Sequence, residues 1–286
     1  MTQSNDPSVS MLAALIHERT GLFFTENRLD LLADKIRPLL GGAFGSFLDY
    51  YYYLKYDTNG ESEWLRLQSA LAVNESYFWR EVDQIQSVAK VIVPRLQQER
   101  PGRPVRIWHA ACATGEEPYT MAIALTEAGR FLHGPIEILA TDFNNEALNA
   151  ARKGIYRQRS FRGLPPEIFD RYFTPTHDGR TQIDPAIRAR VDLRYANLLD
   201  LSGTPTNPPF DVIFCRNAFI YFSEASIRQV IGQFHKVLTP SGFLFVAAAE
   251  SLLRITNAFH LVEVGSAFGY QKQETGNGEA HGAIRG

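Results

Sequence analysis

The sequence has 286 residues, of which 45% are hydrophobic, so it can bury a sizeable core in one large or two smaller domains. A formal net charge of -2 argues against a nucleic-acid partner, because surfaces that bind phosphate backbones need a clear basic excess. Two cysteines argue against a disulfide framework, and no apolar run approaches the roughly 20 residues that span a bilayer. We therefore expect a soluble, cytoplasmic, monomeric protein without membrane insertion.

The first quarter of the chain shows apolar residues at helical spacing and no strand pattern before residue 74. A row of tyrosines from Tyr50 to Tyr53 favours packing between helices over a binding surface. We predict an all-helical N-terminal domain over residues 1–80. Its expected helices cover residues 9–20, 29–39, 47–56 and 64–71.

From residue 81 the pattern alternates between helices and strands, which is typical of a parallel α/β fold. A helix over residues 84–98 leads into Pro101-Gly102-Arg103-Pro104, which breaks it before the first strand. We predict a Rossmann-like domain over residues 81–273. Its expected strands cover residues 105–108, 136–140, 212–215 and 243–247, and its helices cover residues 116–128, 145–152 and 224–238.

Two segments break this alternation. Residues 176–195 hold short β-type runs too closely spaced for helices, so we predict a small antiparallel insertion over about residues 174–195. Two apolar runs flank Gly265-Ser266, which predicts a terminal hairpin. Residues 274–286 are polar and glycine-rich, and we expect a disordered tail.

The segment from Val105 to Glu117 predicts a strand, a turn of small residues and a helix start. Ala111, Ala113 and Gly115 lie where such a turn lets a ligand approach the backbone. Asp142 ends the next strand about 25 residues later, a position where an acid commonly binds ribose hydroxyls. Asp142 could also cap the following helix, and both roles can coexist. The pattern indicates a nucleoside cofactor without identifying it.

Four sequence motifs, which follow one another along the chain, indicate more closely which kind of protein this is. They are Asn-Glu-Ser-Tyr-Phe-Trp-Arg-Glu at residues 74–81, Ala-Thr-Gly-Glu-Glu-Pro-Tyr-Thr at 113–120, matching residues within 147–156, and Phe-Asp-Val-Ile-Phe-Cys-Arg-Asn at 210–217 followed by Ile220-Tyr221-Phe222. These motifs resemble the signatures of the CheR family, the chemoreceptor glutamate methyltransferases of bacterial chemotaxis. Because four motifs match in the same order, chance similarity is improbable.

The resemblance implies a fold, an activity and a partner. The implied fold is a Rossmann-like class I methyltransferase domain with a small antiparallel β insertion, preceded by an all-helical N-terminal domain. The implied reaction transfers a methyl group from S-adenosylmethionine to glutamates of methyl-accepting chemoreceptors, giving glutamyl methyl esters and S-adenosylhomocysteine. A glutamate with a pKa of about 4.3 is already ionised at neutral pH, so the reaction needs no general base.

The resemblance also implies site residues. Arg80 would orient the acceptor, Tyr221 would face the methyl group, and one acid would hold the methionine ammonium, with Glu117 favoured over Glu116. Arg80 could instead form a surface ion pair with Glu75 or Glu81. No metal is expected, and His109 is interpreted as a packing or hydrogen-bonding residue. The implied cofactor-binding residues are Asn74, Ser76, Arg80, Glu117, Asp142, Asn197, Leu198, Arg216 and Asn217.

The sequence departs from the family pattern in places. In well-known members of the family the second helix is arginine-rich, whereas the corresponding stretch here holds only Arg28, Lys35 and Arg37, so receptor docking is expected to be weaker or differently arranged. The family's Gly-His-Ser-Glu becomes Ala-Ala-Ala-Glu at residues 247–250, so the role of that histidine is absent. The insertion carries no recognisable signature for a receptor peptide.

Three alternative functions stay open at this stage. They are a sensory module that binds S-adenosylmethionine or its product without turnover, a methyltransferase of a signalling array outside chemotaxis, and a nicotinamide-dependent oxidoreductase. The last is suggested only by the Rossmann-like alternation.

Overall fold

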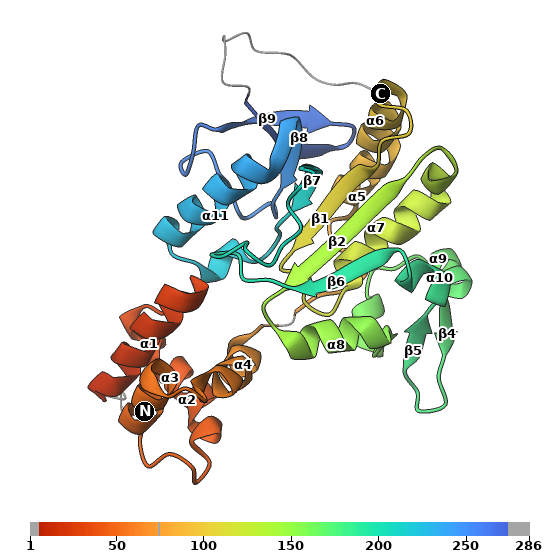
Figure 1. Ribbon diagram of the computed structural model, residues 1–286. Coiled ribbons are helices and arrows are strands. Elements are labelled where there is room, and N and C mark those ends of the chain that lie inside the picture. Colours follow the sequence, from red (N-terminus) through yellow and green to blue (C-terminus); the bar gives the residue numbers. More distant parts are fainter. Residues whose placement is uncertain (1–5, 74, 274–286) are drawn as a thin grey trace.

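The computed structural model describes residues 6–73 and 75–273. Asn74 and the predicted disordered tail lie outside the described residues. Figure 1 shows a group of helices from the N-terminal quarter packed at one end of a larger α/β part. No helix among the described residues is long and apolar enough to cross a membrane.

The N-terminal helices share a core of their own, as the apolar spacing predicts. Leu12, Ile16, Leu32, Tyr50 and Leu67 are all fully buried in it. Within the tyrosine row, Tyr50 and Tyr51 are buried, while Tyr52 is exposed, which confirms packing as the main role of the row. The helices are α1 (Pro7–Thr20), the 3-10 turn η1 (Glu26–Arg28), α2 (Leu29–Leu40), α3 (Phe47–Tyr56) and α4 (Gly60–Leu71).

The α/β part is built on a seven-stranded sheet in the order β6-β2-β1-β7-β8-β10-β9. The first five strands in that order are parallel, whereas β10 runs antiparallel to both of its neighbours. The terminal hairpin is therefore confirmed as β9 and β10. The strands are β1 (Val105–Ala110), β2 (Ile136–Asp142), β6 (Val191–Tyr195), β7 (Phe210–Phe214), β8 (Leu238–Phe245), β9 (Phe259–Val264) and β10 (Ala267–Lys272).

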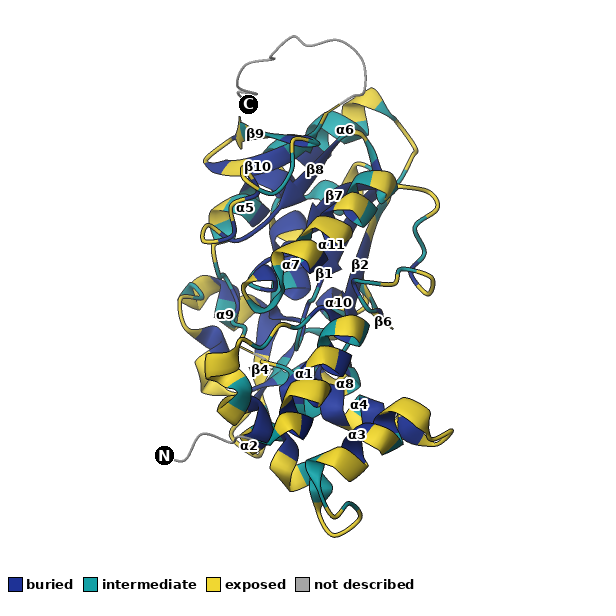
Figure 2. Cartoon of the chain, turned by 90° about the vertical axis from the view of Figure 1, so that its left-hand side faces the viewer, coloured by how far each residue is buried: buried dark blue, intermediate teal, exposed yellow. Residues whose placement is uncertain are grey.

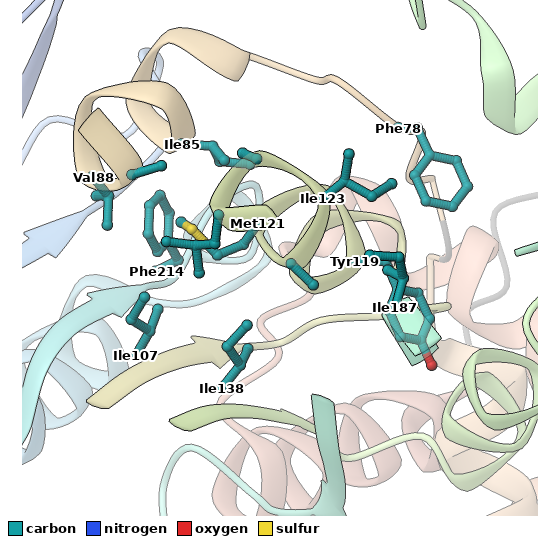
Figure 3. Close-up of a cluster of buried hydrophobic side chains, with 14 of the residues drawn as sticks. Phe78, Ile85, Val88, Ile107, Tyr119, Met121, Ile123, Ile138, Ile187 and Phe214 are labelled. Carbon is teal, nitrogen blue, oxygen red and sulfur yellow. The ribbon is translucent and has the colours of Figure 1, made fainter. Parts of the chain in front are cut away.

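Helices cover both faces of this sheet, so neighbouring residues of one strand enter different cores. Ile107 packs in the core beneath α7 (Glu116–Glu127), where Figure 3 shows it near Met121 and Phe214. Trp108 packs on the opposite face, with Phe234 of α11 (Glu224–Val237). Figure 2 shows the resulting layers, with buried strands between helices whose outer surfaces are exposed. Continuous apolar strands are the expected signature of a sheet buried on both faces.

The predicted helix over residues 84–98 is continuous but changes its winding. It comprises α5 (Val82–Ser87), a π-helical turn η2 (Val88–Ile92) and α6 (Val93–Glu99). Pro94 has no backbone N–H and its ring collides with the carbonyl of the preceding turn, and a wider π turn relieves that conflict. The other helices and turns of this part are η3 (Arg130–Leu132), α8 (Asn145–Lys153) and η5 (Phe219–Tyr221).

The inserted antiparallel sheet is present, but its predicted extent is wrong. It consists of β3 (Ile155–Tyr156), β4 (Phe173–Pro175) and β5 (Thr181–Ile183), with η4 (Gln158–Phe161), α9 (Pro166–Tyr172) and α10 (Pro185–Arg188) around it. The run Val191–Tyr195, assigned to the insertion from its sequence, is instead strand β6, which pairs in parallel with β2 at the edge of the main sheet. Together with α8, the insertion forms the crossover between these two strands.

Candidate functional site

A cavity opens at the carboxyl ends of β1, β2 and β6, where the α/β part meets the N-terminal helices. Ligands of open parallel sheets bind at this end of the strands, so the topology already favours the location. The α/β part contributes Ala111, Ala113, Asp142, Phe143, Ala196, Asn197, Leu198, Asn217, Ala218, Tyr221 and Phe222 to the lining. The helical part contributes Thr20, Leu22, Phe23, Phe24, Arg28, Leu31, Lys35, Leu71, Ala72 and Val73.

The turn after β1 is strained where it faces the cavity. Ala111 and Ala113 both line it with left-handed backbones, at φ 59° and 48°, which residues with a Cβ rarely adopt. Gly115 serves a different purpose, since a Cβ there would lie 2.9 Å from the Cβ of Ala151. The two alanines therefore shape the cavity, while the glycine lets α7 pack closely against α8.

Three backbone donors of this turn are already occupied. The N–H of Cys112 donates to the Thr141 carbonyl, that of Ala113 to the Asp142 carboxylate, and that of Gly115 to the Cys112 carbonyl. A pyrophosphate needs free N–H groups at this position, and acids at the start of the helix oppose an anion. The turn is consequently unsuited to a nicotinamide dinucleotide.

Asp142 is the cavity's carboxylate at the end of β2. Its Oδ2 accepts from the N–H of Ala113 at 2.8 Å and its Oδ1 from that of Asn144 at 2.8 Å. Burial raises the pKa of Asp142 to about 6, against the opposing effect of these hydrogen bonds. The cap of α8 is Asn144, whose side chain accepts from two N–H groups of the first turn. Asp142 is thus left facing the cavity, as a ribose ligand would be.

The two neighbouring acids at the start of α7 have different surroundings. Glu116 is buried and accepts from Thr114 Oγ1 at 2.6 Å and Ser160 Oγ at 3.0 Å. Glu117 keeps an 18% exposed side chain, lies 2.7 Å from His109 Nδ1, and approaches Arg216 Nε at 3.1 Å. Glu117 is not among the residues that line the cavity, but its partial exposure makes it the acid of this pair that can still accept a cationic ligand.

Burial and neighbouring charge act in opposite directions on Glu117. Burial favours the neutral acid, yet Arg216 and His109 together outweigh it and hold the pKa of Glu117 below its usual value. The carboxylate is therefore ionised at neutral pH.

Arg216 links Glu117 to the segment that carries Arg80. The buried guanidinium donates to the carbonyl of Arg80 at 2.6 Å and to that of Glu81 at 3.3 Å. Glu81 has a left-handed backbone at φ 46°, so the segment is strained where Arg216 holds it. Arg216 lies behind Glu117 and is not among the residues lining the cavity, and its predicted contact with a cofactor remains untested.

Arg80 does not form the surface ion pair considered from the sequence. Its Nη1 donates to the carbonyl of Glu75 at 3.0 Å, and its guanidinium lies over the ring of Tyr77. The Glu75 carboxylate pairs with Arg162 instead. Arg80 and the half-buried Ser76 belong to the strand-free segment before α5, outside the cavity lining.

Tyr221 and Asn217 lie on a loop after β7 that a buried acid holds in place. Glu250 accepts from the N–H groups of Asn217 at 2.8 Å, Ala247 at 3.1 Å and Ile220 at 3.3 Å. Burial raises the pKa of Tyr221, so its hydroxyl stays neutral and can donate a hydrogen bond. No role was expected for Glu250 from the motifs, although the altered Ala-Ala-Ala-Glu motif retains that acid.

Asn197 and Leu198 follow β6 and form another part of the wall. Asn197 Nδ2 donates to the carbonyl of Arg19 at 2.6 Å, so this side chain also ties the helical part to the sheet. Leu198 is buried and adds apolar surface. Together with Phe143, these residues can contact a planar base.

The helical part contributes more to the cavity than its sequence suggested. The apolar run after α1 reaches the Tyr221 loop, where the Phe23 N–H donates to the Tyr221 carbonyl at 2.8 Å and Leu22 forms a β-bridge with Phe222. Lys35 Nζ donates to the carbonyls of Ala70 and Leu71 and lines the cavity. Two of the three basic residues considered for receptor docking, Arg28 and Lys35, therefore face the cavity.

These side chains fit a nucleoside that carries an amino acid. Asp142 suits ribose hydroxyls, the ionised Glu117 suits an ammonium group, and the apolar wall suits an adenine ring. The parallel sheet with an antiparallel β10 placed between β8 and β9 departs from the all-parallel dinucleotide-binding order. The fold and the site define a Rossmann-like class I methyltransferase that uses S-adenosylmethionine.

Comparison with known proteins gives the family. The model of the CheR methyltransferase SAM-binding domain matches residues 74–268. Chemotaxis protein methyltransferase 2 of Vibrio cholerae is 35% identical over 271 residues, covering 92% of each chain. The chemotaxis protein methyltransferase of Salmonella typhimurium is 30% identical, covering 90% of this chain and 88% of its own. The chain belongs to the CheR family of S-adenosylmethionine-dependent chemotaxis methyltransferases.

Proposed function

We propose that the protein methylates glutamate side chains on the cytoplasmic domain of chemoreceptors, giving glutamyl methyl esters and S-adenosylhomocysteine. The supporting observation is the composition of the cavity. Its described lining contains no histidine or cysteine that could remove a proton, and its acid, Asp142, already accepts two backbone N–H groups. An amine or hydroxyl acceptor would need a base, whereas a glutamate arrives ionised.

The surrounding charge supports an anionic acceptor. Arg28 and Lys35 line the cavity on the helical side, and burial lowers the pKa of Lys35, as expected for an ammonium short of water. Positive side chains at the mouth of a site attract an approaching carboxylate. The same charge would disfavour a protonated amine as acceptor.

Each site residue then has a distinct proposed task. Asp142 and Glu117 hold the two polar ends of the cofactor, while Leu198 and Asn197 flank its base. Bound S-adenosylmethionine supplies an electrophilic methyl group. Arg80 orients the acceptor carboxylate, and the neutral Tyr221 hydroxyl fixes the geometry of approach. A sensory module without turnover is not favoured, because it would have no use for these two groups.

The direct test incubates the protein with methyl-labelled S-adenosylmethionine and cytoplasmic fragments of the receptors encoded beside it. We expect label on the receptor that alkali releases as methanol, the behaviour of a carboxyl ester. Alkali-stable label would indicate a different acceptor atom. Label on another sensory protein instead of chemoreceptors would favour a signalling array outside chemotaxis.

The role of Arg80 has its own test. Arg80→Ala should lower kcat by about 100-fold while S-adenosylhomocysteine affinity stays within about threefold, since positioning energy appears only in the reacting complex. Arg37→Ala, which removes an exposed arginine of α2, is the control for lost positive charge. Equal losses of turnover and affinity would move Arg80 from the acceptor to the cofactor.

A further inference from the structure

His109 is a buried histidine whose ring is fixed on one side. It is the last residue but one of β1, has no exposed surface, and stacks on Phe214 with ring centroids 4.9 Å apart and planes 8° from parallel. Its Nδ1 lies 2.7 Å from Oε1 of Glu117. Because Glu117 is ionised and can only accept, Nδ1 must carry the proton and donate.

The other ring nitrogen has no such contact. Among the residues that the structure describes, none forms a hydrogen bond with Nε2 of His109, although the atom is fully buried. An unpaired buried polar atom lowers stability, so a phenylalanine would suit the stack on Phe214 better if packing were the only requirement. The bond to Glu117 is the feature that a histidine adds at this position.

The two oxygens of Glu117 are held from different directions. His109 donates to Oε1, and the Arg216 guanidinium approaches Oε2 without an aligned N–H bond. Each carboxylate oxygen can accept more than one donor, and Glu117 retains an exposed part. Among the described residues, His109 therefore supplies the one aligned hydrogen bond that sets the rotation of this carboxylate, and it leaves room for a further donor.

We propose that His109 is a positioning residue which, by its hydrogen bond to Glu117, orients that carboxylate to receive the ammonium group of the methionine moiety. The inference rests on the proposed role of Glu117 in cofactor binding. It confines the effect of His109 to the amino-acid end of the cofactor. Affinity for the adenosine end, which Asp142 and Leu198 contact, should be independent of His109.

The test compares two ligands by calorimetric titration of the full chain. S-adenosylhomocysteine carries the ammonium group, whereas methylthioadenosine keeps the adenosine and sulfur but lacks the amino acid. His109→Phe retains a ring on Phe214 and removes the donor, and His109→Asn places an amide N–H close to the position of Nδ1. Thermal unfolding of each variant checks that it is folded.

We expect His109→Phe to weaken S-adenosylhomocysteine about tenfold, the effect of losing one charge-assisted hydrogen bond, with methylthioadenosine within about twofold of wild type. His109→Asn should recover most of the lost affinity. Glu117→Gln should lose the same preference, and adding His109→Phe to it should cause little further loss, because both changes act through one contact.

Two results would overturn the role of His109. They are unchanged affinity for S-adenosylhomocysteine in His109→Phe, or an equal loss for both ligands, which indicates a packing role alone. If His109→Phe does not fold, the proposal is tested with His109→Asn. This variant must then keep the wild-type preference for S-adenosylhomocysteine over methylthioadenosine, and its loss would contradict the role of His109. A wild-type protein that binds neither ligand would instead refute the proposed function, so the two failures are distinguishable.

Discussion

In its proposed role as the ribose ligand, Asp142 should make cofactor binding depend on pH, because burial changes its ionisation. Burial places its pKa at about 6 instead of the ordinary 3.8. Only the ionised form offers both oxygens to ribose hydroxyls. S-adenosylhomocysteine affinity should be constant above about pH 7 and fall by up to about tenfold per pH unit below about pH 6. Calorimetry across this range measures it.

The same group affects stability in the opposite sense. Because its folded pKa is raised, Asp142 contributes stability that is present below its unfolded pKa and lost as pH rises through about 6. Asp142→Asn is the control for binding, since it cannot ionise, and it should bind weakly with no inflection near pH 6. An inflection that survives in this variant would assign the titration to another residue.

Glu250 is predicted to support the loop that carries Tyr221 without contacting the substrate. Glu250→Ala leaves three backbone N–H groups without their acceptor, which should lower the free energy of unfolding by about 1–3 kcal/mol and reduce kcat more than cofactor affinity. Urea unfolding and kinetics measure the two effects. Glu263→Ala, on the exposed face of β9, is the matched control and should change stability by less than about 0.5 kcal/mol.

Some site residues could be predicted from the sequence and others could not, depending on whether a local motif marks them. Asp142, Asn197, Leu198, Asn217 and Tyr221 line one cavity, as the motifs led us to expect. Glu250 was missed because its role is to accept backbone N–H groups from a loop about 30 residues away, and no local pattern records such a contact. The family motifs also could not show that Arg216 lies behind Glu117.

At the scale of elements, the contact between the end of α1 and the Tyr221 loop depends on one glycine. Gly21 ends α1 at φ 79°, and a Cβ there would lie 2.6 Å from Cε1 of Phe222. Gly21→Ala should therefore lower the free energy of unfolding by about 2–3 kcal/mol, from backbone strain and overpacking together. It should also lower kcat, because Phe222 follows Tyr221.

Gly42→Ala separates these two causes. Gly42 has nearly the same backbone, at φ 80°, but nothing within 4 Å of its Cβ position. It should lose only about 1 kcal/mol and keep its kcat. If both variants lose equal stability and Gly21→Ala retains full activity, the packing of α1 on the loop has no catalytic consequence.

The elements were predicted well where their signal is local. The four α-helices of the N-terminal part and the alternation after residue 81 follow from apolar spacing and breakers, and the structure contains them. β6 was misassigned because five residues of β-type sequence do not specify a partner. Its pairing with β2 joins residues about 50 positions apart, and the short α10 before it gave no sign of a crossover.

At the scale of the whole molecule, a bound cofactor should stabilise both the helical part and the α/β part. Both the helical part and the α/β part line the cavity. S-adenosylhomocysteine at about 100 times its Kd should therefore add about 2.7 kcal/mol to the free energy of any unfolding that separates the two parts. Hydrogen exchange should slow in α1 and α2 as well as in β1 and β2. Protection confined to residues after 105 would show that the helical part does not sense the cofactor.

The contacts of residues 19–23 with Asn197 and with the Tyr221 loop bear on how this chain can diverge. Asn197 holds the Arg19 carbonyl, Leu22 pairs with Phe222, and the Phe23 N–H is bonded to Tyr221. If the helical domain were replaced by that of a relative in order to change the receptor, the residues lining one side of the cavity would change as well. We therefore expect a new helical domain to need matching substitutions around residues 197 and 217–226. In that case the helical part and the α/β part change together during evolution.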